Sequence, residues 1–388
     1  MFYELAGSPW GEEELRAAHR VLDSGMLTMG ESVRRFEAAF AERFGVKHAI
    51  MVNSGSSANL LGVAALCHRK ERPLRRGDEV IVPAIAWATT YTPLQQYGLR
   101  LRFVDVELHS LNIDVAQLEA ALTPQTRMVV AVSVLGNPCA LDALRAFCDK
   151  HGLVLFEDNC ESLGARLWGR WCGGFGDVGS FSFFYSHQIS TIEGGALVTD
   201  DAELADLARS LRSHGWAREL APDSPLAPRE ADFPEAYRFL LPGYNLRPTE
   251  INGAIGLVQL EKLDALLKAR RRNAALFREL LGGDRRFILQ CENGESSWFA
   301  FTVILDPAHG ADRQRVFAAL AAAGIGYRMI TGGNFLRHEA IRHFEHSRAG
   351  DMKNADLAHD RGFFVGNQPR DLRPQIERFC TVLCDAAG

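Results

Sequence analysis

Apolar residues near the start of the chain predict two amphipathic helices. They recur at three- and four-residue intervals in two sets, Leu15, Ala18 and Leu22, then Val33, Phe36, Phe40 and Phe44. This spacing places the side chains of each set on one face of a helix. Ser8 and Pro9 predict where the first helix begins, because a hydroxyl residue followed by proline is a favoured helix start. Gly25 predicts where it ends.

Continuous apolar runs then alternate with helical patterns. The runs that predict strands are 48–55, 78–84, 101–106, 127–136 and 153–159, and the segments that predict helices between them are 56–66, 87–98 and 141–152. Uninterrupted apolar strands separated by helices are typical of a parallel sheet covered on both faces. The predicted fold class is therefore α/β, with ligands expected beyond the carboxyl ends of the strands.

The pattern changes after residue 200. Residues 217–238 are rich in Pro, Asp, Glu and Arg and predict a long surface loop. A long helix is expected within 243–280, where Ile251, Ile255 and Val258 keep helical register. An apolar run at 296–305 and a helical pattern at 312–324 then indicate a smaller α+β domain. We therefore expect a large domain over 1–250 and a small one over 251–388.

Composition narrows the function classes. The 388 residues carry 43 Lys and Arg against 48 Asp and Glu, a net charge of -5, which argues against nucleic acid or an anionic membrane as partner. The eight cysteines are scattered without a pair or quartet of metal-ligand spacing, so we expect reduced thiols and no metal site. The first residues lack a signal-peptide pattern and no long apolar run occurs, so we expect a cytoplasmic protein.

Two motifs follow predicted strands. "NSGSSAN" (53–59) places small and hydroxyl residues at a helix start, where free backbone N–H groups favour a phosphate. Its alternative is an ordinary capping turn. "EDNCES" (157–162) places Asp158 and Glu161 just past an apolar strand, where a buried carboxylate needs a cationic or hydrogen-bonding partner. Its alternative is a helix cap.

Two further motifs supply other polar groups. In "SFSFFYSHQIST" (180–191), Ser182 alternates with aromatic residues, so it should face away from them, and His187 lies in a polar loop. A lone histidine is usually a surface or core residue, but its neighbours favour a function here. In "GYNLRPTE" (243–250), Asn245 and Arg247 precede a helix and could hold a phosphate. Their alternative is a cap and a surface salt bridge.

Together these stretches resemble a known family. In order and spacing, "NSGSSAN", "EDNCESLGA", "SFSFFYSHQISTIEGG", "RSHGW" and "GYNLRPTEINGAIGLVQL" are similar to the DegT/DnrJ/EryC1/StrS sugar aminotransferases. The resemblance implies a fold type I enzyme dependent on pyridoxal 5′-phosphate (PLP), like aspartate aminotransferase. Its large domain would hold a mostly parallel, seven-stranded sheet between helices. It also implies a homodimer with shared active sites.

The resemblance assigns roles to the motifs. Asp158 would pair with the pyridine nitrogen, Trp87 would stack on the ring, and Glu161 takes the place of the glutamine that most relatives carry near the ring hydroxyl. The side chains implied for the phosphate are Ser56, Ser57, Ser182 and, from the second subunit, Asn245.

His187 stands where most members carry the lysine that binds the cofactor covalently. The resemblance therefore implies a branch that uses pyridoxamine 5′-phosphate (PMP), formed with glutamate, to remove the C3 hydroxyl of a nucleotide-linked 4-keto-6-deoxyhexose and release ammonia. A GDP-mannose-derived substrate is expected. His187 would be the acid and base, since a histidine suits proton transfer near neutral pH. His214 is a second candidate, and the residues expected to contact substrate are Arg247, Arg328 and Asn334.

Three alternatives remain open at this level. The chain could be an aminotransferase that tolerates His187, a dehydratase for another nucleotide sugar, or a silent relative that binds a sugar nucleotide. Persistence of Asp158, Ser182 and Trp87 disfavours the last. A related branch adds an iron–sulfur cluster, which needs clustered cysteines. The scattered cysteines of this chain predict no cluster.

Overall fold

The computed structural model describes residues 2–222, 224–227 and 235–388. Its largest sheet has eight strands. The strand order is β1-β9-β8-β5-β4-β2-β3-β13. Their bounds are β1 (His48–Val52), β9 (Gly195–Thr199), β8 (Val178–Ser182), β5 (Val154–Asp158), β4 (Thr126–Val132), β2 (Glu79–Pro83), β3 (Arg100–Val104) and β13 (His346–Arg348).

This sheet confirms the mostly parallel arrangement. Only β9 runs against its neighbours β1 and β8, and the other neighbouring pairs are parallel. The expected seven strands are present, and the structure adds an eighth at the edge. This strand, β13, comes from far along the chain and pairs with β3.

Helices cover both faces of the sheet. Alternate residues of β4 enter different apolar clusters: Met128 and Val130 face the side of α3 (Gly55–His68), while Val129 and Ala131 face α6 (Leu141–His151). Alternation across a strand gives each face its own core. The other helices of this part are α4 (Ala88–Gln96), α5 (Leu118–Ala121) and α7 (Ala202–Arg212), and a small hairpin is formed by β6 (Arg166–Leu167) and β7 (Arg170–Trp171).

The two N-terminal helices form, but the first starts later than expected. Helix α1 spans Glu12–Ser24 after Gly11, whose N–H donates to Glu14 at 2.7 Å. The prediction of a start at Ser8 and Pro9 was wrong, because the carboxylate of Glu14 accepts from the N–H of Gly11 and satisfies the helix end there instead. Gly25 ends the helix in the left-handed region as predicted. Helix α2 spans Glu31–Phe44, and its predicted apolar residues are buried.

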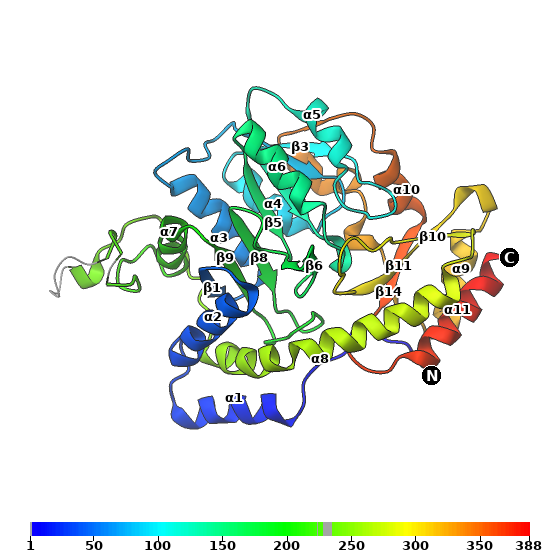
Figure 1. Cartoon of the computed structure of the whole chain (residues 1–388), viewed down its shortest axis with the longest axis horizontal. Coiled ribbons are helices and arrows are strands. Elements are labelled where there is room, and N and C mark those ends of the chain that lie inside the picture. The colour runs from blue at the N-terminus through cyan, green and yellow to red at the C-terminus, as the bar shows by residue number, and fades with distance from the viewer. Residues whose placement is uncertain (1, 223, 228–234) are drawn as a thin grey trace.

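A second sheet builds the smaller part. It has the order β10-β11-β14-β12. Its elements are β10 (Phe287–Leu289), β11 (Ala300–Leu305), β14 (Gly362–Gly366), β12 (Tyr327–Arg328), α9 (Arg313–Ala322), α10 (Lys353–Arg361) and α11 (Arg373–Ala387). The long helix α8 (Glu250–Leu281) runs from α1 and α2 to α11, so it joins the two parts (Figure 1).

Two short segments cross between the parts. Tyr3, near the N-terminus, lies in the core of the four-stranded sheet, and its hydroxyl donates to the carbonyl of Gly366 at 2.6 Å. Strand β13, from the C-terminal third, belongs to the large sheet. The division at residue 250 falls at the start of α8 and stays a prediction.

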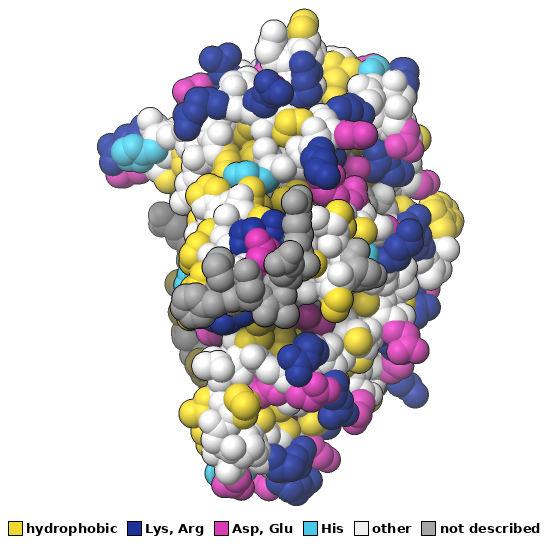
Figure 2. Space-filling view, turned by 90° about the vertical axis from the view of Figure 1, so that its left-hand side faces the viewer, with side chains coloured by type: hydrophobic (Ala, Val, Ile, Leu, Met, Phe, Trp, Pro, Cys, Tyr) yellow, Lys and Arg dark blue, Asp and Glu magenta, His cyan; other side chains and the backbone are white. Residues whose placement is uncertain are grey.

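The surface carries both charges. Figure 2 shows basic and acidic side chains interspersed on the face that it presents. Part of the predicted 217–238 loop, residues 223 and 228–234, lies outside the described residues. Across the described chain, no helix combines the length and apolar character that a membrane crossing requires.

Candidate functional site

A pocket of about 570 Å³ opens where parallel strands of the large sheet end. Its floor comes from the ends of β5 and β8, and one wall from the starts of α3 and α4. The other wall comes from the smaller part, with Phe299, Arg328, Met329 and Thr331. The pocket therefore lies between the two parts, at the position expected for a ligand in an α/β sheet.

The start of α3 forms an anion cradle in this pocket. Ser54 caps the helix, since its hydroxyl accepts from the N–H of Ser57 at 3.1 Å. A side chain at Gly55 would lie 2.5 Å from Cβ of Ser182, so only glycine lets the helix start approach β8 this closely. Ser56 is exposed to the pocket beside Thr89. The backbone N–H groups at the start of α3 and the hydroxyls of Ser56 and Ser182 therefore line the same part of the pocket.

The aromatic-serine alternation on β8 orients its side chains as predicted. Phe181 and Phe183 are fully buried and pack against Phe40, at centroid distances of 5.2 and 5.5 Å. Ser182 points to the opposite side and lines the pocket. Core packing on one side of the strand therefore fixes the polar group on the other.

Asp158 is held at the pocket floor by two neutral donors. Its Oδ2 accepts from Nδ2 of Asn59 at 2.9 Å and from the hydroxyl of Thr90 at 2.7 Å. Its Oδ1 accepts from the N–H of Cys160 at 3.1 Å. The described chain pairs this carboxylate with no cation, so its charge is available to a cationic partner in the pocket. Sequence reasoning missed Asn59 and Thr90, although both lie in or beside motifs that it used.

Glu161 links the turn after β4 to the wall that the smaller part provides. Its Oε2 accepts from the N–H of Leu135 at 2.9 Å and from the hydroxyl of Thr331 at 3.3 Å. Burial, together with the charge of Asp158, raises the pKa of Glu161 to about 7. This carboxyl group therefore changes its protonation near neutral pH.

His187 lies against two phenylalanine rings. Its imidazole meets Phe184 and Phe299 edge-on, at centroid distances of 5.8 and 5.0 Å. Burial, together with the positive charge of Arg270, lowers the pKa of His187 to about 3. Within the described residues its Nδ1 has no hydrogen-bond partner. The site thus contains a neutral imidazole with an uncommitted nitrogen.

Trp87 is the exposed aromatic of the site. It precedes α4, lines the pocket and leaves 58% of its surface exposed. A large indole exposed to this extent in a pocket is available to stack on a flat ligand. No lysine occurs among the described residues that line the pocket.

Other predicted residues lie outside this pocket. The hydroxyl of Ser57 donates to Asn53 at 2.6 Å. His214, Asn245 and Arg247 form a separate cluster: Arg247 lies 3.3 Å from Nε2 of His214 and donates to Oδ1 of Asn245 at 3.1 Å. None of these four predicted residues lines the pocket within the described chain.

The two predicted substrate residues of the small part differ. Arg328 lines the pocket. Asn334 is 2% exposed, donates to Asp356 at 2.9 Å and accepts from the N–H of Leu336 at 3.0 Å. The side chain of Asn334 caps a short helical turn and does not line the pocket within the described chain, and its substrate contact stays a prediction.

Comparison with known proteins identifies the family. The model of the DegT/DnrJ/EryC1/StrS aminotransferase family matches residues 9–382. The chain belongs to this family, which confirms the resemblance seen in its motifs.

Individual relatives carry a more specific name. GDP-4-keto-6-deoxy-D-mannose 3-dehydratase of Yersinia pseudotuberculosis is 46% identical over 384 residues, covering 98% of each chain. The solved structure of the Escherichia coli GDP-4-keto-6-deoxy-D-mannose-3-dehydratase with bound hydrated PLP superposes with a TM-score of 0.96 at 43% identity, over 98% of this chain and 99% of that one. A structure of such a dehydratase with a trapped PLP–glutamate geminal diamine matches with the same score and identity, over 98% of this chain and all of the other.

Proposed function

We propose that this protein is a PLP-dependent 3-dehydratase that removes the C3 hydroxyl of GDP-4-keto-6-deoxy-D-mannose. The observation that carries the proposal is His187. The pocket keeps a phosphate cradle, a carboxylate and an exposed indole, yet a neutral imidazole takes the place of the family's lysine. An imidazole can move protons but cannot form the covalent link that a lysine amine forms.

The residues present fit PLP or PMP. The start of α3, Ser56 and Ser182 suit the phosphate, and the closeness that Gly55 permits is the structural sign of such a cradle. Asp158 would hold the pyridine nitrogen protonated, and Trp87 would stack on the ring. When bound as PMP, the cofactor supplies an amine for the sugar ketone and an electron sink for cleavage of the C3–O bond.

His187 would carry the protons. As a neutral base it would take the proton from C4′ of the cofactor, and it would then deliver a proton to the departing C3 hydroxyl. Phe184 and Phe299 hold the imidazole between their ring edges. Glu161 lies in the same pocket and, with a pKa of about 7, is a further proton donor near the site.

Glutamate would regenerate PMP. The electrons that reduce C3 come from glutamate, which leaves as 2-oxoglutarate while ammonia is released. Arg328 would face the nucleotide sugar.

The free thiols of all eight cysteines support a cytoplasmic setting.

We further propose a homodimer in which each subunit completes the other's site. Its support is the cluster of His214, Asn245 and Arg247, which carries polar groups suited to a phosphate but does not line the pocket of its own chain. Asn245 is exposed on this cluster. Arg247 and Asn245 would therefore act in the pocket of the partner subunit.

To test this proposal, the purified protein is incubated first with PLP and L-glutamate and then with the GDP-linked 4-keto-6-deoxymannose, while the absorbance and the products are measured. We expect the absorbance of PMP to appear first. The product should have one oxygen atom fewer than the substrate, and ammonia and 2-oxoglutarate should form in step. An aminotransferase would instead give an amino sugar that keeps its C3 oxygen and would release no ammonia.

Variants of His187 separate its role from cofactor binding. His187→Asn should bind PLP but lose product formation by at least about a hundredfold, which is typical of a lost general base. His187→Lys should give a cofactor adduct that borohydride traps on the protein. A borohydride-stable adduct on the wild-type chain, or dehydration that survives in His187→Asn, would contradict the proposal.

A further inference from the structure

Arg270 is a buried cation with no acidic partner. It lies on α8 and is 1% exposed. No carboxylate within the described residues forms an ion pair with it, and burial alone lowers its pKa to about 10, so it stays charged at neutral pH. An unpaired charge in the interior is costly, and such groups persist where neighbouring dipoles hold them.

The guanidinium is held by backbone carbonyls from three segments. It donates to the carbonyl of His187 at 3.2 Å, to that of Phe299 at 3.1 Å and to that of Asn367. The amide of Asn367 in turn donates to the carbonyl of Arg270 at 3.1 Å and to that of Trp298 at 2.8 Å. The three segments are the loop after β8, the start of β11 and the end of β14.

Two of these segments hold the imidazole itself. His187 carries the ring, and Phe299 supplies the side chain that the ring meets edge-on at 5.0 Å. One planar fork therefore sets the position of the base relative to the wall that it packs against, and that wall belongs to the smaller part.

We propose that Arg270 is a positioning residue for His187, fixing the imidazole against the smaller part through the carbonyls of His187 and Phe299. The proposal rests on the proposed function for the role of His187. Its positive charge has a second effect, since it disfavours protonation of the imidazole and so preserves the base form.

Other charged or titratable side chains share the pocket with His187. The charged or titratable side chains that line the same pocket are Asp158, Cys160, Glu161, Glu193 and Arg328. Among charged groups, Arg270 is the one that lowers the pKa of His187, in addition to burial. Removal of the guanidinium should therefore raise the pKa of His187, and its replacement by lysine should not.

Two variants separate the charge from the fork. Arg270→Lys keeps a cation and loses the planar fork, while Arg270→Met removes both. The pKa of His187 is measured in the cofactor-free protein by NMR of histidine labelled at Cε1, with His187→Asn assigning the signal. We expect an upward shift of about one pH unit or more in Arg270→Met, and little shift in Arg270→Lys.

Steady-state kinetics provide the second measurement. Both variants should lower kcat by about tenfold or more with little change in KM, because a small misplacement of a reacting group costs rate rather than binding. Cofactor affinity, followed by fluorescence, should stay within about twofold, since Arg270 touches none of the groups assigned to the cofactor. Far-UV circular dichroism checks that each variant is folded.

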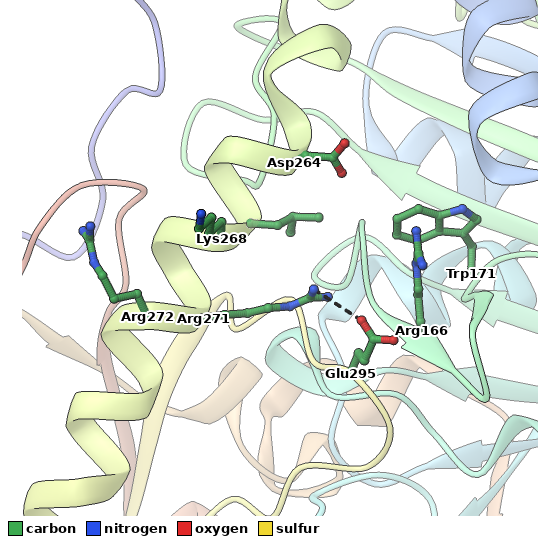
Figure 3. A pocket seen from close by; sticks show the side chains of 8 residues that line it. Arg166, Trp171, Asp264, Lys268, Arg271, Arg272 and Glu295 are labelled. Atoms are coloured by element: carbon green, nitrogen blue, oxygen red, sulfur yellow. Dashed lines mark ion pairs between the residues drawn. The ribbon is translucent and has the colours of Figure 1, made fainter.

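The neighbouring Arg271 offers a matched control. It lies on the same helix and also donates to carbonyls, those of Ser296 at 3.0 Å and Gly164 at 3.2 Å. It faces a separate surface pocket, where Glu295 pairs with it at 3.4 Å (Figure 3). Arg271→Met should leave both the pKa of His187 and kcat unchanged.

The outcomes discriminate between ideas. If kcat of folded Arg270→Lys equals that of the wild type, the positioning role is wrong, and if the pKa of His187 stays low in folded Arg270→Met, the electrostatic link is wrong. The NMR measurement does not use the reaction, so a pKa shift without any dehydratase activity in the wild type would overturn the proposed function and leave the electrostatic link standing.

Discussion

Glu161 connects the turn after β4 in the large part to the segment after β12 in the smaller part. One of its oxygens accepts from the backbone N–H of Leu135 and from the hydroxyl of Thr331. Both of these residues adopt left-handed backbone conformations, with φ of 51° and 44°. Such conformations are unfavourable for residues with branched side chains, so the surrounding contacts must hold them in place.

The pKa of Glu161 predicts a pH dependence of stability. In the folded chain it is about 7, against an ordinary 4.5. Between these values only the folded state binds the proton, so the contribution of Glu161 is fully present below about pH 4.5 and is lost as the pH rises through about 7. Glu161→Gln, which keeps the shape of the side chain without a titrating group, should remove this loss.

Urea denaturation of the cofactor-free protein checks this expectation. As the pH rises from about 5 to about 8, the free energy of unfolding of Glu161→Gln should increase by on the order of 1 kcal/mol relative to that of the wild type. Glu193→Gln, which changes an exposed carboxylate of the same pocket, is the control. Parallel pH profiles for wild type and Glu161→Gln would refute the raised pKa.

The sequence predicted some of these residues and could not predict others. Asp158, Ser182 and His187 follow from motifs at strand ends, because local polarity stands out against an apolar background. Asn59 and Thr90 lie far along the chain from the Asp158 that they hold, and no spacing rule links them. The sequence does not single out Arg270 either. It is followed by Arg271 and Arg272, and a run of three arginines on a helix is typical of a solvent-exposed surface.

At the scale of elements, the start of α3 carries the proposed phosphate site. Its approach to β8 depends on Gly55, where an added Cβ would lie 2.5 Å from Cβ of Ser182 and 2.8 Å from the sulfur of Cys160. Both neighbours are anchored at strand ends, so the helix would have to move instead.

Gly55→Ala should therefore weaken cofactor binding and stability together. We expect a loss of about 1–3 kcal/mol in the free energy of unfolding, as for other overpacked sites, and at least about a tenfold loss in PLP affinity. Thermal melting and a fluorescence titration measure the two effects. Gly283→Ala, at a position with open space around it, is the matched control. Unchanged PLP affinity in Gly55→Ala would argue against the cradle.

The strands show which parts of the sheet the local sequence pattern predicts and which it does not. The apolar strands β1 to β5 follow from composition, because burial on both faces demands it. Strand β13 is His346–Arg348, a polar triplet with no strand pattern, and it forms only because β3 offers a free edge. The start of α1 was misplaced because Glu14 caps Gly11, while Ser8 bonds Trp10 instead.

At the scale of the whole molecule, the proposed dimer predicts complementation between defective chains. His187→Asn lacks the base, and a variant combining Asn245→Ala with Arg247→Ala lacks the groups proposed to act in the partner's pocket. Each variant alone should be nearly inactive. After unfolding and refolding an equal mixture, about a quarter of the sites should be intact, because half of the dimers are mixed and each mixed dimer has one complete site.

Product formation by the refolded mixture is the measurement. Refolding each variant by itself provides the control and should restore nothing. No recovery in the mixture, with dimers shown by light scattering, would mean that the cluster of His214, Asn245 and Arg247 serves its own chain.

The position of Tyr3 has a consequence for how the protein is made. This residue pairs with Ile325 and bonds the carbonyl of Gly366, so the first residues of the chain belong to a core built from the last. During synthesis, the ribosome releases Tyr3 long before β14 exists. The N-terminal segment must therefore wait, unpaired, until β14 has been synthesised, while the large sheet can already assemble β1 to β5, β8 and β9. Completion of the smaller part is thus expected to follow assembly of these strands.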